Sequence, residues 1–176
     1  MGLVELSAVV INKSMLIGIR VQTPDQQNSQ LILGFLHCGS TFSCINWKAA
    51  QALGLPPKTD SLYRSGPAIS ALGIDGRPLT LLTIENQLSY AGNPIIDLDS
   101  RRTVDFESPP VNWKPWDPVQ LAVGDIPVFG NILEDGLTPY EGPAALIGLY
   151  ILAQRRIVLE AGMSGCRKRK VAIAPN

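Results

Sequence analysis

The chain has 176 residues, of which 45% are hydrophobic and 17% are charged, so it can form a core and does not have the composition of a disordered segment. Fifteen basic and fifteen acidic residues give a formal net charge of zero, which argues against a nucleic-acid partner or a membrane surface. Sixteen glycines and fourteen prolines predict many turns, and the length is that of one domain over residues 1–176.

The first half of the chain predicts short strands and one helix. Residues 3–11 and 15–21 have the apolar content of strands, and the polar residues between them predict a tight hairpin turn. The apolar run at 31–36 predicts a buried strand. A short helix is predicted after Asn46, which can cap its start, and Gly54 can end it.

The second half predicts further strands and a second short helix. Residues 65–84 indicate two strands around a turn at Asp75 and Gly76, and residues 119–133 indicate a strand pair around Gly124. Between them, residues 86–117 are irregular and are interpreted as a long insertion with one strand near 95–98. A strand ending at Gly148 precedes the second helix.

The last residues predict a closing hairpin from 155–160 and 170–175, joined by a polar turn that includes a short basic run. Regularly spaced short strands favour a barrel or a sandwich over a parallel α/β sheet. We therefore expect a mainly β fold with two short helices.

The cysteines and the N-terminus indicate in which cellular compartment the protein is expected. Cys38, Cys44 and Cys166 are odd in number and irregularly spaced, which argues against a secreted disulfide framework and against a structural zinc site. The N-terminus lacks the pattern of a signal peptide, and no apolar run reaches the roughly 18–20 residues that span a bilayer. We expect a soluble intracellular protein without a metal or another cofactor.

The stretch "GFLHCGSTFSCI", followed by "AAQALGL", is similar to the active-site strand and the following helix of the retropepsin-like aspartic proteases. That family has apolar residues, then Asp, Thr or Ser, Gly, and a small residue. Here Gly39 and Ser40 match the last two positions, and Ser43 lies in the usual continuation. The residues from Ala49 to Leu55 match the helical turn and its stop.

Three further segments support the resemblance in the same order along the chain. Residues 71–79, with Gly73, Ile74, Asp75 and Gly76, resemble the glycine-bearing flap hairpin that contacts substrate. The segment with Leu146, Ile147 and Gly148 resembles the apolar element before the C-terminal helix, and the closing hairpin resembles the last strands. The resemblance implies a closed retropepsin-like β-barrel with a long insertion, and a homodimer whose active-site loops meet at the two-fold axis.

The chain departs from the family at the position that carries the chemistry. Aspartic proteases need two carboxylates that share a proton, one from each protomer in a retropepsin dimer. Here His37 stands at the Asp position and Cys38 at the Thr or Ser position. A symmetric dimer would then present two imidazoles and no carboxylate. No other acidic residue stands at the motif: Asp60, Asp75, Asp97, Asp99, Asp105 and Asp117 all lie elsewhere in the chain.

The leading interpretation is a retropepsin-like pseudoprotease that serves as a dimerisation or peptide-interaction module, with His37, Cys38, Gly39 and Ser40 as a degenerate site of packed, hydrogen-bonded residues. The former cleft would hold an extended peptide as an added strand under the flap. Two alternatives stay open. One is an active peptidase that uses an unconventional site or an Asp from a partner chain. The other is a structural dimer bridged by a metal bound to His37 and Cys38 of both chains.

Overall fold

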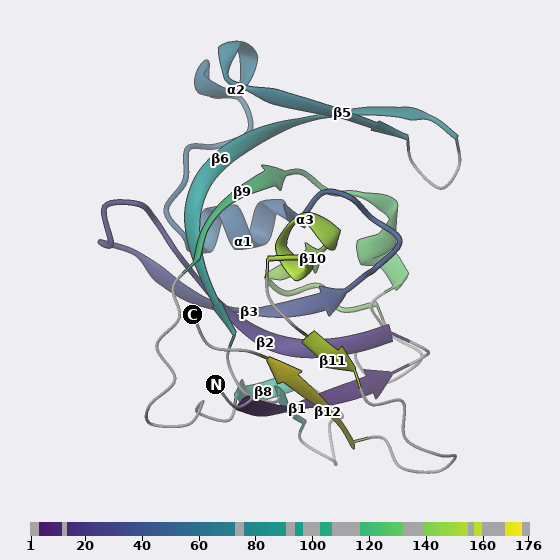
Figure 1. The fold of residues 1–176 in the computed structure, drawn as a ribbon. Coiled ribbons are helices and arrows are strands. Elements are labelled where there is room, and N and C mark those ends of the chain that lie inside the picture. The colour runs from purple at the N-terminus through teal and green to yellow at the C-terminus, as the bar shows by residue number, and fades with distance from the viewer. Residues whose placement is uncertain are drawn as a thin grey trace.

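The computed structural model describes residues 4–11, 14–72, 76–90, 94–96, 103–106, 117–131, 139–154, 157–159 and 168–173. Most of the described elements are strands (Figure 1). In chain order they are β1 Val4–Ile11, β2 Ser14–Gln22, β3 Ser29–Leu36, β4 Cys44–Ile45, α1 Trp47–Ala52, α2 Leu62–Ser65, β5 Ala68–Leu72, β6 Pro78–Tyr90, β7 Pro94–Ile96, β8 Thr103–Phe106, β9 Asp117–Val123, the 3-10 helix η1 Pro127–Asn131, β10 Ala144–Ile147, α3 Leu149–Leu152, β11 Ile157–Leu159 and β12 Lys168–Ile173.

Six of the strands close into a barrel. The large sheet has the order β11-β12-β1-β2-β3-β10-β4-β9-β6-β5, and β2 also pairs with β6. That extra pairing joins the two ends of the run from β2 to β6 and closes it. The strands β1, β12 and β11 extend the sheet beyond one side of the closure, and β5 extends it beyond the other. The prediction of a mainly β fold with a closed barrel is confirmed.

Two strand contacts in the barrel are parallel, although the neighbouring pairs are antiparallel. β10 runs parallel to β3 and β4 runs parallel to β9. β10 therefore lies between the strand before loop 37–43 and the strand after it, which fixes both ends of that loop. Its four residues are buried on both faces, which explains the unbroken apolar run "AALI".

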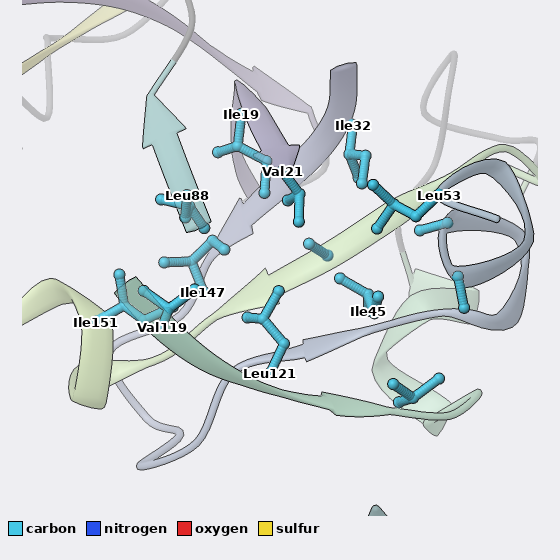
Figure 2. Packing of buried hydrophobic residues seen from close by; sticks show 14 of the residues in the cluster. Ile19, Val21, Ile32, Ile45, Leu53, Leu88, Val119, Leu121, Ile147 and Ile151 are labelled. Atoms are coloured by element: carbon cyan, nitrogen blue, oxygen red, sulfur yellow. The ribbon is translucent and has the colours of Figure 1, made fainter. Parts of the chain in front are cut away.

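The barrel interior is filled by one cluster of aliphatic side chains (Figure 2). On β10, Ala145 and Ile147 belong to this cluster, whereas Ala144 and Leu146 belong to a second cluster. Successive side chains of a strand point to opposite faces, so the second cluster lies on the outer face of the barrel. In Figure 2, Leu53 beside α1 and Ile151 of α3 lie on opposite sides of the interior cluster, so the two helices close the barrel core.

The outer cluster is covered by η1 and by the β5–β6 hairpin. Ile126 and Phe129 belong to it from the η1 region, and Leu81 of β6 belongs to it as well. Ile69 of β5 and Leu79 of β6 pack against it while partly buried. In Figure 1 the hairpin extends over the barrel at the top of the view. The second cluster therefore packs between the barrel wall and the hairpin.

The predicted elements hold with four differences, the first of which is the short barrel strand β4, which lies where no strand was predicted. Residues 126–133 were expected as a strand, but Pro127–Asn131 form η1, with the Phe129 N–H donating to the Ile126 carbonyl at 3.0 Å, and residues 132–133 lie outside the described residues. The short helix α2 was not predicted, so the described residues contain three α-helices rather than two. β6 continues through Tyr90, into the segment expected to be irregular, and β7 pairs with β8 in a small separate sheet.

Candidate functional site

The loop at residues 37–43 leaves the end of β3 and is held by backbone hydrogen bonds. The His37 N–H donates to the Ile147 carbonyl at 3.0 Å, which continues the parallel β3–β10 pairing by one residue. The Ser40 N–H donates back to the His37 carbonyl at 3.2 Å, which closes a tight turn over Cys38 and Gly39. The four motif residues therefore form a turn at the edge of the barrel.

The His37 side chain packs against the ring of Phe35. The two ring centroids are 5.3 Å apart with an interplanar angle of 28°. Both residues lie on the same face of the chain because they are two positions apart. A Cβ atom on Gly39 would lie 3.1 Å from His37 Nε2, so the glycine gives the imidazole room to lie over the turn. His37 is half-buried, whereas Cys38 is exposed. The expectation that Cys38 is packed is wrong for the single chain.

The far end of the loop is bound to the start of α3. The Gly148 N–H donates to Ser43 Oγ at 2.9 Å, and both residues are buried. The Leu149 N–H donates to the Ser40 carbonyl at 2.7 Å, and the Tyr150 N–H donates to the Thr41 carbonyl at 3.1 Å. These contacts supply partners for the first N–H groups of the helix, which have none within it.

Gly148 is required by the closeness of this contact. A Cβ atom at residue 148 would lie 2.1 Å from the Phe42 carbonyl oxygen and 2.7 Å from that of Ser40. No side chain can be placed there without moving the loop. The predicted structural residues Ser43, Leu146, Ile147 and Gly148 therefore lie together at the base of loop 37–43.

A cavity of about 500 Å³ lies between this loop and the β5–β6 hairpin. Its walls come from the loop, both strands of the hairpin, β9, β10, the start of η1 and α3. The polar part of its lining consists of His37, Ser40, Thr41, Ser43, Ser70, Thr83, Gln120 and Tyr150. The apolar part includes Phe42, Ile69, Leu72, Leu79, Ile126, Val128 and Leu146. Among the described residues of this lining there is no Asp, Glu, Lys or Arg.

The strand β5 offers an unpaired edge beside the cavity. It is the last strand of the large sheet among the described residues and pairs with β6 on its other side. Ile69 and Ala71 are half-buried and line the cavity, while Leu72 is 76% exposed. Gly76 adopts a φ of +74°, as expected for a turn glycine. Gly73, Ile74 and Asp75 of the predicted flap lie outside the described residues.

None of the described acidic residues supplies a carboxylate to this lining. Asp60 Oδ1 accepts from the Leu62 N–H at 2.8 Å at the start of α2. Asp117 is buried at the beginning of β9 and lies outside the cavity lining. Asp97 and Asp99 lie outside the described residues, and nothing is described of the Asp105 side chain.

Within the described ranges, no group of three or more His, Cys, Asp or Glu side chains could hold a metal ion. In the same part of the chain, no helix is long and apolar enough to cross a bilayer.

Several residues of the site were not anticipated from the sequence. Phe35, which packs against His37 but does not line the cavity, could have been found, because its two-residue spacing from His37 places both on one face of the chain. Thr83, Gln120, Ile126 and Val128 carry no local signal, since they reach the cavity only through the pairing of β6 with β9 and through the turn into η1.

The chain matches no family model and no curated protein sequence. Among solved structures it matches a retropepsin-like aspartic protease from Rickettsia conorii at 11% sequence identity, with a TM-score of 0.44. The match covers 98% of this chain and 94% of that chain. Neither the identity nor the TM-score is high enough to assign the chain to that family.

Proposed function

We propose that this chain is a retropepsin-like pseudoprotease, which lacks peptidase chemistry and serves as a peptide-binding and dimerisation module. The observation that carries the proposal is the composition of the cavity. His37 lines it at the position where the resembled motif has Asp, and its described lining residues include no carboxylate.

The chemistry of aspartic proteolysis cannot run on this lining. That reaction needs one ionised carboxylate to take a proton from water and one protonated carboxyl group to polarise the scissile carbonyl. A pair of neutral imidazoles does not reproduce the shared proton, and two imidazolium groups would repel each other and could not accept a proton. A partner chain that supplied one Asp would still leave a single carboxylate.

The same site has what peptide binding requires. Among the described strands, β5 has one edge without a partner, and this edge can accept an extended segment by backbone hydrogen bonding, which is a common way to recognise peptides. The cavity beside it is lined largely by apolar side chains and can take side chains that alternate along such a segment. Binding therefore needs only groups that the chain retains.

A surface next to the loop supports dimerisation. Leu149 is 43% exposed and Tyr150 is 52% exposed at the start of α3, and both are bonded through their N–H groups to the loop. Cys38 is exposed on the same loop. An apolar surface beside the motif turn suits contact with a second copy of the chain around a two-fold axis.

The proposal is tested by peptide cleavage. The wild-type chain should cleave no peptide of a mixed substrate library between pH 3 and pH 8, as followed by mass spectrometry. The double variant His37→Asp with Cys38→Thr restores the motif and should gain cleavage that a transition-state-mimicking aspartic protease inhibitor blocks. The matched control, His37→Asn with Cys38→Thr, supplies no carboxylate and should stay inactive. Inhibitor-sensitive cleavage by the wild type would refute the proposal.

A further inference from the structure

The charge of the cavity lining singles out His37. The other described lining residues are apolar, or are Ser, Thr, Gln and Tyr residues that carry no charge near neutral pH. Histidine is the one side-chain type that ordinarily changes charge between pH 5 and pH 8. The described lining can therefore be neutral or carry a single positive charge, but it cannot become negative in that range.

This composition limits the ligands that the cavity can accept. A Lys or Arg side chain that enters it loses water and meets no carboxylate among the described groups. A Glu or Asp side chain meets the same penalty while His37 is neutral. Once the imidazole is protonated, it can donate a charge-assisted hydrogen bond to the carboxylate. Uncharged side chains are not affected by either state.

We propose that His37 is a specificity-determining residue: the cavity takes extended segments with uncharged inserted side chains, rejects cationic ones, and admits a carboxylate side chain only when His37 is protonated. This inference rests on the proposed peptide-binding function. It gives the imidazole at the former acid position a role in selecting ligands rather than in catalysis.

The surroundings of the imidazole support this role. Its ring lies on Phe35 and over Gly39, and the loop and α3 add the neutral Ser40, Thr41, Ser43 and Tyr150 to the described lining, of which Cys38 is not a part. β5, β6, β9, β10 and η1 contribute only uncharged side chains to the described lining. Asp75 at the hairpin turn lies outside the described residues, so the test treats it separately.

The experiment uses capped peptides, which carry no terminal charges. Three pools of acetylated and amidated octapeptides are randomised over Val, Leu, Thr and Phe, and each carries Gln, Glu or Lys at one central position. The pools are incubated together with immobilised wild-type protein at pH 8 and at pH 5.5, and the captured peptides are quantified by mass spectrometry.

We expect Gln peptides to be captured over Lys peptides by at least about tenfold at both pH values, because an unpaired cation is costly to desolvate. The ratio of Glu to Gln peptides should rise by about tenfold from pH 8 to pH 5.5. The variant His37→Phe keeps an aromatic ring against Phe35 but cannot be protonated, so its Glu-to-Gln ratio should rise less than that of the wild type, and only through protonation of the peptide. That variant also corrects for protonation of the peptide itself.

A second readout does not depend on any variant. The chain contains one histidine, so its imidazole C–H signal is assigned in a proton NMR spectrum of the untagged protein without further work. The Glu pool should raise the pH midpoint at which that signal titrates, since a nearby carboxylate favours the charged imidazole. The Gln pool should leave the midpoint unchanged.

The outcomes that overturn the inference are distinct. Equal capture of all three pools, or the same change of the Glu ratio in the His37→Phe variant, refutes charge selection by His37 and leaves peptide binding intact. If the wild type captures Lys peptides and the Asp75→Asn variant does not, the inference is refuted, because Asp75 rather than His37 then selects the charge of the ligand. No capture of any pool at either pH refutes both the inference and the peptide-binding function.

Discussion

At the scale of single residues, the two described cysteines lie in opposite environments. Cys44 is buried at the start of β4, and its thiol donates to the Gly124 carbonyl oxygen at 3.4 Å. Burial raises the pKa of the Cys44 thiol well above its ordinary range. Cys38 is exposed in the turn beside His37. Since the thiolate is the reactive form, the two side chains should differ in reactivity.

Alkylation measures that difference. With iodoacetamide at pH 8 and at a dilution where the chain is monomeric, Cys38 should be modified at least about tenfold faster than Cys44, as followed by peptide mass mapping. Denaturant should equalise the two rates. The pKa of the Cys44 thiol is higher in the folded chain than in the unfolded chain, so the folded state holds this proton more tightly. The contribution of Cys44 to stability is therefore complete below the thiol pKa of the unfolded chain and falls as the pH rises above that pKa. Equal rates in native buffer would contradict the buried position of Cys44.

At the scale of elements, the site depends on the hydrogen bonds between loop 37–43 and the start of α3. The loop supplies carbonyl acceptors for two N–H groups of the helix and a hydroxyl acceptor for the Gly148 N–H. None of these contacts involves the imidazole. The hydrogen bonds that join the loop to α3 therefore do not depend on the side chain at position 37.

Removing the hydroxyl of Ser43 tests the bond. The variant Ser43→Ala leaves the buried Gly148 N–H without its acceptor and should lower the free energy of unfolding by about 1–3 kcal/mol. Urea denaturation measures this change. Ser43→Thr keeps the hydroxyl and should lose less, and Ser65→Ala, at an exposed position of α2, should change stability by less than about 0.5 kcal/mol. Equal stabilities of Ser43→Ala and the wild type would show that the hydrogen bond from Gly148 to Ser43 does not stabilise the fold.

Prediction from the sequence worked for elements with local signals. The helix α1 begins after Asn46, whose Oδ1 accepts from the Ala49 N–H at 2.9 Å, and Gly54 has a φ of +72° just after its end. The expectation failed for η1 and α2, which span five and four residues and show no periodicity that separates a helical turn from a strand or a loop. Their conformation is set by packing and by turns that the local sequence does not encode.

The candidate site was predictable only in part for the same reason. The motif located its centre, because Gly39 and Ser40 lie in one segment and Gly148 in another that resembles the same family. The opposite wall comes from η1 and β9, which are distant in sequence from loop 37–43 and reach it through the parallel pairing of β4 with β9. Long-range pairing of this kind leaves no pattern in either segment.

At the scale of the whole molecule, the exposed apolar side chains bear on the proposed dimer. Leu149 and Tyr150 leave an apolar surface beside the loop, and Leu72 is exposed at the end of β5. A second copy around a two-fold axis would cover the first of these surfaces. The zero formal net charge places no strong repulsion in the way of self-association.

Sedimentation measures the association. The wild-type chain should form a dimer, and Leu149→Glu should raise its dissociation constant by at least about tenfold, because the change places an unpaired charge in an apolar contact. Leu62→Glu is the matched control, since Leu62 is 52% exposed on α2 and should not affect the dimer. An unchanged dissociation constant for Leu149→Glu would exclude this surface from the interface.

The strand β6 has a further consequence, which concerns motion. Its first residues, from Pro78 to Leu82, pair with the edge strand β5, whereas its later residues pair with β9, and the last of them also with β2. One continuous backbone thus passes from a segment paired with the edge strand β5 to a segment paired with β9, and at Gln87 and Leu88 it is paired with both β9 and β2. Opening free energies follow such differences in pairing. If a ligand enters, we expect β6 to bend at its Pro78–Leu82 end and the residues that pair with β9 to stay in place.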